Sequence, residues 1–338
     1  MRALILLAVL LLASACATTT PTPPPAPTAG PAPAAPRQVL GESADFIVVT
    51  ARQGDTAELL AATYLDDRTK SWMIEDYAGA TTFTAGQPVV IPKRAWNPTG
   101  VYPNGYQLVP VLVYHNIGPV AKGRLVLAAE AFGEQMRYLK REGYRVVTLA
   151  EFVEWLQLRR QLPKKTVVLT FDDGYRSFRE YAYPVLKELG FPATLFVYTD
   201  YVGAGKNALG WDDLKALAAE GFDIQAHSKT HADLRRADGE TEAQYTKRMQ
   251  AELAEPPKLF QRQLGRQVPF LAYPYGRVDD NLLTRVKDQG YTAAFTVRRE
   301  SNAAFVPLLQ IRRSQIYSEM TLEQFAKNLN LFHTEDLR

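Results

Sequence analysis

From Tyr106 onward, short apolar runs of β-forming residues alternate with stretches of helical periodicity, and this alternation restricts the fold more than any other feature. The β-type runs are Leu108–Tyr114, Tyr144–Leu149, Thr166–Phe171, Ala193–Tyr198, Phe222–Ala226, Phe270–Tyr273, Thr292–Val297 and Leu308–Ile311. Residues 179–190 illustrate the helical stretches, with Leu186 and Leu189 on one face and Gly190 as a stop. Such alternation predicts parallel strands joined by helical crossovers. Seven or eight β-α units in about 230 residues fit a closed barrel better than an open, doubly wound sheet.

The length and charge of the chain indicate how many domains it has and which partners are excluded. A chain of 338 residues exceeds one average domain, so we expect one large domain and a smaller one. The formal net charge is only +3 and no basic block is present, which argues against a nucleic-acid partner. We expect a monomer.

The N-terminus has the pattern of an export signal. Met1 and Arg2 precede the apolar run Ala3–Ala13, which is too short to span a bilayer as a mature helix. The run ends in Ala13-Ser14-Ala15-Cys16, and Cys16 is the only cysteine. This segment resembles a bacterial lipobox, although Ala13 stands where leucine is usual. We therefore expect residues 1–16 to be a lipoprotein signal peptide, with an ordinary signal peptide or a chance cysteine as alternatives.

This interpretation implies an exported protein that is lipid-anchored in the bacterial cell envelope, in the outer membrane or the periplasm. Ala17 carries no acidic retention signal, which by resemblance to Gram-negative lipoproteins directs the protein to the outer membrane. Residues 17–43 form a tether rich in proline, alanine and threonine, which cannot collapse or form a helix.

Residues 44–94 read as a compact βααβ unit, which residues 95–105 link to the rest of the chain. A short strand leads into a Gly54-Asp55 turn and a helix, and a second strand ends at Pro92. The unit resembles a LysM module, a small fold that binds glycans containing N-acetylglucosamine, through Gly54-Asp55-Thr56 and Gly86-Gln87. The usual asparagine is absent near Glu75-Asp76-Tyr77. The alternative is a βααβ spacer with a degraded groove.

Chemistry-bearing residues follow several predicted strands. Asp172 and Asp173 end the run Thr166–Phe171, and His227 and His231 follow the run Phe222–Ala226. In a parallel barrel these positions lie at the end where active sites form. Two imidazoles and one carboxylate with an open position are typical of a catalytic zinc site. Taken separately, an Asp-Gly turn and a chance pair of histidines explain the two motifs equally well.

Together these motifs resemble the first three motifs of the polysaccharide deacetylase (NodB-homology) family. The matching stretches are Thr170–Tyr175, His227-Ser228-x-x-His231 and Tyr273–Gly276, and the resemblance covers residues 106–338. It implies an α/β fold, a distorted (β/α)7 barrel preceded by the small LysM-like domain. It also implies metal-dependent hydrolysis of N-acetyl or O-acetyl groups on a glycan.

The resemblance implies roles for individual residues. Asp172 would be the general base, and the main-chain N–H of Tyr275 would stabilise the oxyanion. Tyr175 and Pro274 would contact the substrate. The metal ligands would be Asp173, His227 and His231, and the divalent metal would be Zn²⁺, with Co²⁺ or Ni²⁺ as alternatives.

Two features of the family are missing. Ala272 stands where many members have an arginine that tethers the catalytic aspartate; Arg277, Arg312 and Arg313 are candidates to replace it, and the last two are preferred. Arg313 is also a candidate substrate contact. The late Leu-x-His motif has no match, because His333 lies in the last few residues and reads as a surface residue. His115 is then the candidate catalytic acid or substrate contact, with a buried structural role as the alternative.

The sequence thus predicts a metal-dependent N-deacetylase that acts on a polysaccharide containing N-acetylglucosamine, either peptidoglycan or poly-N-acetylglucosamine. An esterase that removes O-acetyl groups from a xylan-type polysaccharide would use the same residues. A catalytically silent glycan-binding lipoprotein is the third hypothesis.

Overall fold

The computed structural model describes residues 37–338, so the predicted signal peptide, Cys16 and most of the predicted tether lie outside the described residues. The strands are β1 (Val39–Glu42), β2 (Phe46–Thr50), β3 (Pro88–Pro92), β4 (Val101–Tyr102), β5 (Gly105–Gln107), β6 (Val111–Tyr114), β7 (Asn116–Gly118), β8 (Val126–Ala128), β9 (Arg145–Val146), β10 (Thr166–Asp173), β11 (Thr194–Val197), β12 (Asp223–Ala226), β13 (Phe270–Ala272), β14 (Ala293–Phe295), β15 (Ser314–Gln315) and β16 (Phe332–Thr334). The helices are α1 (Ala57–Tyr64), α2 (Ser71–Ala78), α3 (Ala129–Arg141), α4 (Leu149–Leu156), α5 (Tyr183–Leu189), α6 (Trp211–Ala219), α7 (Glu242–Met249), α8 (Glu255–Leu264), α9 (Asp280–Asp288) and α10 (Leu322–Ala326). Within residues 37–338, none of the helices combines the length and the apolar character needed to cross a membrane.

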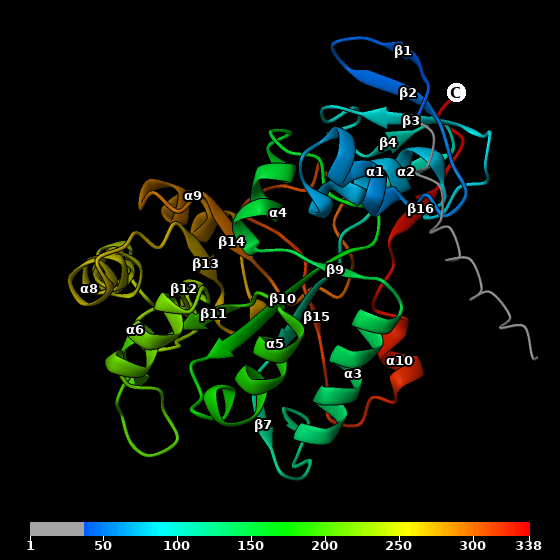
Figure 1. Cartoon of the computed structure of the whole chain (residues 1–338). Coiled ribbons are helices and arrows are strands. Elements are labelled where there is room, and N and C mark those ends of the chain that lie inside the picture. Colours follow the sequence, from blue (N-terminus) through cyan, green and yellow to red (C-terminus); the bar gives the residue numbers. More distant parts are fainter. Residues whose placement is uncertain (1–36) are drawn as a thin grey trace, which may run out of the picture. The chain divides into compact units, whose positions relative to one another are not determined.

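A curled parallel sheet forms the centre of the larger part of the chain (Figure 1). Its strands run in the order β14-β13-β12-β11-β10-β6-β15, with β9 paired to β10, and every one of these pairings is parallel. Because parallel neighbours need crossovers, helices lie between consecutive strands of this sheet from β6 to β14, as the alternation in the sequence predicts, whereas no helix lies between β14 and β15. The predicted α/β barrel fold is therefore confirmed.

The segment from Ile311 to Gln315 meets both edges of this sheet. At one edge the Ile311 N–H donates to the Ala294 carbonyl, and the Thr296 N–H donates to the Ile311 carbonyl. At the other edge β15 pairs in parallel with β6. One short stretch of chain thus joins the first and last strands of the sheet and curls it into a distorted barrel.

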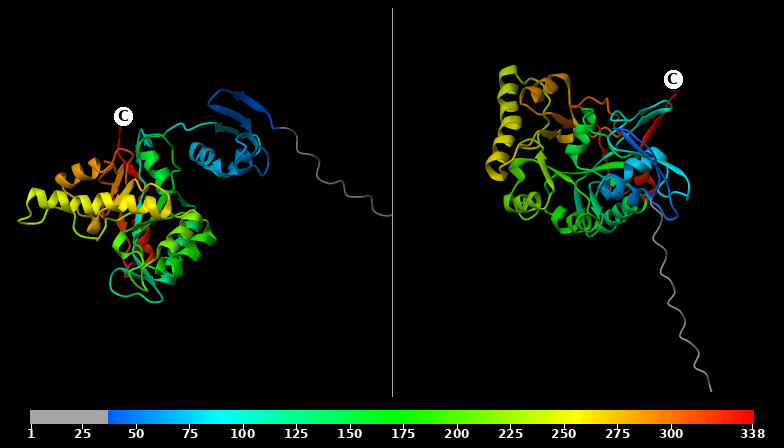
Figure 2. Two further views of the ribbon diagram at one scale, coloured as in Figure 1. Left: turned by 90° about the vertical axis from the view of Figure 1, so that its left-hand side faces the viewer. Right: turned by 45° about the horizontal axis from the view of Figure 1, so that its top comes forward.

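The two faces of the strands have different environments, because successive side chains in a strand point to opposite sides. Leu169, Phe171 and Leu195 belong to the apolar cluster between the sheet and the outer helices. Val168 and Phe196 belong to the cluster inside the barrel, where α4 also packs. In Figure 1, α3, α5 and α10 cover one side of the sheet; Figure 2 shows α7 and α8 as one continuous yellow rod, which the π-helical turn Gln250–Ala254 joins.

The N-terminal part has a sheet and a core of its own. β2 pairs antiparallel with β1 and β3, and α1 and α2 lie between β2 and β3 in the chain. Thr56 caps α1 by accepting the Leu59 N–H, and Gly79 ends α2 with a φ of 69°. The strand-helix-helix-strand order is the expected one, with β1 added to it, whereas the LysM resemblance and the domain bounds stay predictions. Side chains join this part to the barrel part through the Arg145–Glu75 ion pair of 3.1 Å.

Two predicted strands differ from the observed structure. The run Tyr144–Leu149 forms only the two-residue strand β9, because Thr148 and Glu151 cap α4 reciprocally and the helix begins at Leu149. The run Leu308–Ile311 lies before β15, the last strand of the barrel sheet, because the Gln310 N–H donates to the Pro307 carbonyl in a turn. The predicted linker, residues 95–105, contains β4, which pairs with β5, and β5 pairs with β16.

Candidate active site

The candidate site lies at the carboxyl ends of β10 and β12, inside the barrel. Asp172 and Asp173 end β10, and His227 directly follows β12. Asp172 shares the inward face of β10 with Val168 and Thr170 by strand alternation. Regular alternation would turn Asp173 to the outer face, but its φ of 75° departs from strand geometry and brings both carboxylates to one site.

Asp173, His227 and His231 converge on one point. The Oδ1 atom of Asp173 lies 3.6 Å from His227 Nε2 and 3.3 Å from His231 Nε2. One ligand atom from each residue lies within 4.8 Å of the others. Asp173 Oδ1 is buried and, within the described residues, has no hydrogen-bond partner. A buried carboxylate oxygen without a donor beside two imidazole nitrogens fits a divalent cation, with the ligand set of a catalytic site.

The protonation states of these residues favour a cation. Burial raises the pKa of Asp173 to about 6, so its charge requires a compensating positive group near neutral pH. Burial lowers the pKa of His227 to about 4 and also lowers the pKa of His231. Both imidazoles are therefore neutral at physiological pH, which is the form that binds metals.

A main-chain carbonyl orients the first imidazole. His227 Nδ1 lies 2.7 Å from the Ala272 carbonyl oxygen, and since a carbonyl only accepts, Nδ1 donates the hydrogen bond. This bond leaves Nε2 without a proton and directed at Asp173, the arrangement that metal-binding histidines commonly show.

A short loop places the second imidazole, and a buried glutamate secures this loop. Ser228 and His231 have positive φ values of 69° and 63°, and Ser228 Oγ accepts the His231 N–H. Glu252 is buried and accepts three hydrogen bonds from the loop: the Lys229 and Thr230 N–H groups at 3.1 and 3.0 Å, and the Thr230 hydroxyl at 2.6 Å. The loop is held from behind by a residue far along the chain, which no local pattern in the sequence indicates.

Arg313 binds Asp172 with two parallel hydrogen bonds. Arg313 Nη1 lies 2.7 Å from Asp172 Oδ1, and Nη2 lies 2.8 Å from Oδ2. Arg313 also donates to the Thr296 carbonyl and to Thr170 Oγ1. Burial alone would raise the pKa of Asp172, but the charge of Arg313 outweighs burial, with help from His227, and lowers the pKa to about 2. Asp172 is thus an ionised carboxylate 3.8 Å from His227 Nε2.

This geometry bears on the missing family arginine. The side chain of Arg313 has no exposed surface, so it supports the tethering role and leaves no surface for the expected substrate contact. Arg312 pairs with Glu300, and Arg277 pairs with Asp233. Ala272 contributes its carbonyl to His227 instead of a side chain to Asp172.

The two strand-end glycines are required by close packing. A Cβ atom on Gly174 would lie 2.8 Å from Val197 Cγ1, and one on Gly276 would lie 2.5 Å from the Val297 nitrogen. Both glycines have positive φ values, as does Tyr275 between Pro274 and Gly276. The Tyr275 ring is exposed and lies edge-on to His231, with 4.7 Å between the ring centroids. The main chain of Tyr275 thus turns sharply beside the candidate metal ligands.

Tyrosine rings surround the opening of the site. Tyr175 follows Gly174, and burial together with the nearby Asp173 carboxylate raises the pKa of its hydroxyl. Tyr175 contacts Tyr201, and Tyr198 stacks on Tyr201 and contacts His231. Tyr198 and Tyr201 are absent from the residues singled out in the sequence, although Tyr198 ends a predicted strand. Aromatic faces of this kind suit the binding of sugar rings.

The two remaining histidines lie in different places. His115 is half-buried after β6, and it acts electrostatically on both Asp172 and Asp173. Its Nδ1 is buried without a hydrogen-bond partner in the described part of the chain. His333 lies on β16, stacked on Tyr106 and 3.5 Å from Glu335, with about half of its side chain exposed. The expected surface position of His333 fits this geometry, whereas the expected pocket role of His115 stays a prediction.

Comparisons with known proteins agree with the fold. The family model for polysaccharide deacetylase matches residues 159–294. YxkH of Bacillus subtilis is 32% identical over 188 residues, which cover 56% of this chain and 64% of YxkH. The poly-β-1,6-N-acetyl-D-glucosamine N-deacetylase of Staphylococcus aureus is 27% identical over 219 residues, which cover 61% of this chain and 72% of that protein.

Solved structures share the same architecture. The deacetylase PplD of Streptococcus pyogenes, in complex with acetate, superimposes with a TM-score of 0.60 at 27% sequence identity. The match covers 66% of this chain and 98% of PplD. The chain thus spans nearly all of PplD but slightly less than two thirds of YxkH.

Proposed function

Because this chain contains a domain of the polysaccharide deacetylase family, we propose that the protein hydrolyses N-acetyl groups on a polysaccharide containing N-acetylglucosamine and releases acetate. One observation carries the proposal: the Asp173, His227 and His231 ligand atoms converge beside a second carboxylate, Asp172, which is held ionised by Arg313. A site that only bound glycan would have no need for a buried carboxylate pair of this kind.

Each residue has a task that its position supports. A divalent cation held by Asp173, His227 and His231 would supply Lewis-acid chemistry, acidifying water and polarising the acetyl carbonyl. Asp172 accepts a proton from the attacking water as general base. The Tyr275 N–H donates to the oxyanion that forms when the acetyl carbon becomes tetrahedral. His115 gives a proton to the leaving amine, so that one amide and one water become an amine and acetate.

The N-acetyl assignment is supported by the relatives. The S. aureus relative is named as an N-deacetylase of an N-acetylglucosamine polymer. Zn²⁺ is the cation we propose, because two imidazoles and one carboxylate with an open position are its usual catalytic ligands. The N-terminal βααβ part would bind the same polymer if its resemblance to a LysM module holds.

The test is acetate release from N-acetylglucosamine oligomers by the metal-loaded protein, by the protein treated with a chelator, and after metal is added back. We expect release to stop with the chelator and to return with metal. Asp172→Asn should keep its metal and slow turnover by roughly 10²–10⁴, the usual contribution of a general base. Asp173→Asn should lose metal and activity together, because an amide oxygen is a poorer ligand than a carboxylate.

Two controls make this test specific. Asp212→Asn changes a fully exposed aspartate and should behave as wild type. Asp172→Asn leaves Arg313 as a buried charge without its counter-ion, which costs about 3–5 kcal/mol, so thermal unfolding must show that the variant is folded at the assay temperature. If both site variants remain metal-loaded and active, the proposed function is wrong.

A further inference from the structure

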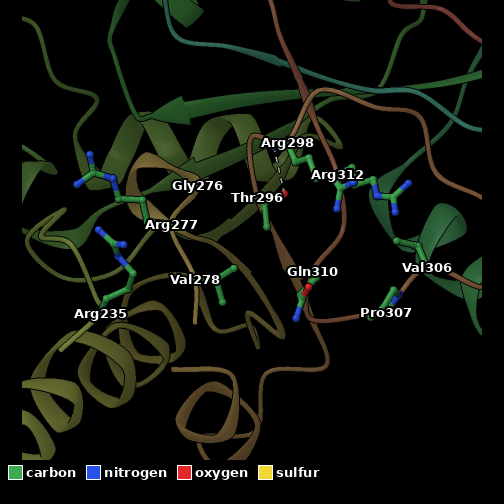
Figure 3. A pocket seen from close by; sticks show the side chains of 10 residues that line it. All are labelled: Arg235, Gly276, Arg277, Val278, Thr296, Arg298, Val306, Pro307, Gln310 and Arg312. Carbon is green, nitrogen blue, oxygen red and sulfur yellow. Dashed lines mark hydrogen bonds between the residues drawn. The ribbon is translucent and has the colours of Figure 1, made fainter. Parts of the chain in front are cut away.

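A cavity of about 410 Å³ lies beside the candidate site, and four of the residues that line it are arginines. They are Arg235, Arg277, Arg298 and Arg312; among the described residues, no aspartate, glutamate or lysine lines this cavity. Figure 3 shows Arg235 and Arg277 on one side and Arg298 and Arg312 on the other, with Val278 and Thr296 between them. We name this cavity the arginine pocket.

Two carboxylates next to the pocket serve four guanidinium groups. Asp233 pairs with Arg235 at 2.7 Å and with Arg277 at 3.0 Å. Glu300 pairs with Arg298 at 3.0 Å and with Arg312 at 2.5 Å. Positive charge therefore exceeds negative charge among these groups, and the shared carboxylates hold the arginines apart on the two sides of the pocket.

The arginines keep N–H donors for a ligand. A guanidinium has five N–H donors, and one carboxylate uses at most two or three of them. All four side chains are partly exposed, so a ligand can reach them from solvent. The planar donor arrangement matches a carboxylate or a phosphate.

The pocket opens at the end of the barrel that carries the candidate metal ligands. Arg235 follows β12, Arg277 follows β13 and Arg298 follows β14, each after the carboxyl end of its strand. The Tyr275 ring contacts both places: it lies edge-on to His231, and the Arg277 guanidinium carbon lies 5.6 Å from its centroid. A polymer whose acetylated sugar sits at the site therefore extends past Tyr275 toward the pocket.

The remaining lining selects the kind of anion. Val278, Val306 and Pro307 place apolar surface beside the arginines. A phosphate has no apolar part that could cover this surface. A carboxylate on a short arm that carries a methyl group can cover it with that methyl group. Lactyl and alanyl carboxylates on a sugar have this structure.

We propose that the arginine pocket is a subsite for a carboxylate on a short aliphatic arm of the sugar next to the N-acetylglucosamine that is deacetylated. The proposal rests on the proposed function and narrows its substrate to an acidic glycan, such as a peptidoglycan strand whose lactyl groups carry no stem peptide. Poly-N-acetylglucosamine has no anion for the pocket, and its deacetylated product carries ammonium groups that the arginines repel.

Binding is measured by titration calorimetry with a chelator present, so that nothing is hydrolysed. The probes are a tetrasaccharide of alternating N-acetylglucosamine and N-acetylmuramic acid, the same compound with its lactyl carboxylates converted to methyl amides, and the N-acetylglucosamine tetramer. We expect the acidic tetrasaccharide to bind about tenfold more tightly than either neutral probe, a ratio typical of exposed charge-assisted hydrogen bonds. The ratio should fall as salt rises from about 0.05 to 0.5 M, because exposed charges are screened.

The test variant is Arg277→Gln with Arg298→Gln. Arg277 and Arg298 are the more exposed members of their pairs, and removing them leaves Asp233 with Arg235 and Glu300 with Arg312. The double variant should lose the preference for the acidic probe. Arg141→Gln, which changes an exposed arginine at the end of α3, should keep it.

Each outcome decides one question. Equal binding of acidic and neutral probes to the wild type, or a preference that survives the double substitution, overturns the subsite. A preference that the methyl amide retains shows that shape and not charge is recognised, which also overturns it. Absence of acetate release from every probe after metal is restored would instead defeat the proposed function, while the calorimetry would still decide the subsite.

Discussion

Arg313 carries its charge inside the barrel, where every donor it uses faces a named acceptor. The sequence indicates that an arginine near the last predicted strand holds Asp172, but it does not decide between Arg312 and Arg313. Adjacent residues in an extended segment point to opposite sides, so the choice depends on the exact register of the strand. That register follows from the Pro307 turn and the pairing of β15 with β6, which are tertiary features.

Arg313→Lys tests the two-point contact with Asp172. Lysine keeps the charge but cannot donate two parallel hydrogen bonds to one carboxylate while also reaching the Thr296 carbonyl. We expect metal content to stay stoichiometric and turnover to fall by about 100-fold, because small misplacement of a catalytic group has effects of this size. Arg160→Lys, at an exposed arginine shared by Glu151 and Glu154, is the control. Equal turnover in both variants would show that the tether is unnecessary.

Backbone strain marks the site in a way that residue types do not. Six non-glycine residues in the described part of the chain have positive φ values, and four of them belong to the candidate site: Asp173, Ser228, His231 and Tyr275. Such conformations cost free energy and persist where surrounding structure enforces them, often at functional sites. None of these residue types requires a positive φ, so the sequence cannot show this feature.

At the scale of elements, the π-helical turn Gln250–Ala254 supports the loop that carries the second histidine. It places Glu252 under the Lys229 and Thr230 N–H groups, although these residues are more than 20 positions apart in the chain. The histidine spacing predicts a shared ligand site but not the support beneath it, because helix periodicity says nothing about which long-range carboxylate a loop will bind.

Glu252→Gln should weaken metal binding without removing a ligand. The amide keeps one acceptor oxygen but places an NH2 group where the Thr230 hydroxyl now donates. We expect metal affinity to fall by about 10–100-fold, the usual effect of losing a group that orients metal ligands, and activity to recover at high metal concentration. Glu255→Gln, in the following helical turn and paired with Lys229 at the surface, should leave affinity unchanged. Unchanged affinity in both variants would rule out the positioning role.

The apolar runs predict most strands because burial on both faces requires them to be continuous. The prediction fails at two runs where a local signal prevails: the capping box of Thr148 and Glu151, and the turn at Pro307. Both signals can be found in the sequence. The alternation of apolar runs and helical stretches does not show, however, that the capping box or the turn outweighs the strand preference of the apolar residues.

Asp76 in α2 links the stability of the protein to pH. Burial raises its pKa to about 6, and its carboxylate accepts the Lys164 N–H at 2.9 Å. Since the pKa is higher in the folded state than the ordinary value of 3.8, folding binds a proton between these values, and the stability gained at low pH is lost as pH rises through about 6.

Asp76→Asn should therefore remove part of this pH dependence. We expect the wild type to gain more unfolding free energy than the variant, by about 1 kcal/mol, when urea denaturation is measured at pH 5 instead of pH 7. Glu58→Gln, at an exposed ion pair with Arg68, serves as the control and should follow the wild type. A variant with the same pH dependence as the wild type would show that Asp76 titrates normally.

At the scale of the whole molecule, the barrel follows from the sequence while the contacts around it do not. Alternating strands and helices are a local pattern, whereas the Ile311–Gln315 closure and the pairing of Arg145 with Glu75 join residues far apart in the chain. The order of the first described strands and helices agrees with the βααβ prediction. Whether that part binds glycan depends on its groove residues, among which the usual asparagine is missing.

We propose that the protein is exported and is anchored through a lipid on Cys16, which lies outside the described residues. If the thiol is the attachment point, Cys16→Ser should move the protein from the membrane fraction to the soluble fraction and abolish labelling by a radioactive fatty acid.

Ser14→Ala is the matched control, because alanine keeps the small residue that the lipobox resemblance requires two positions before the cysteine. This variant should stay in the membrane fraction and take up the fatty-acid label as the wild type does. Cys16→Ser should be soluble and unlabelled. The effect of anchoring on substrate access can also be measured. A protein held by a lipid anchor and a proline-rich tether meets only polymer near the membrane. The soluble variant should therefore act as well as the wild type on purified oligomers but less on intact envelopes. Cys16→Ser protein that remains membrane-bound would show that the apolar run Ala3–Ala13 itself, and not a lipid, holds the chain to the membrane.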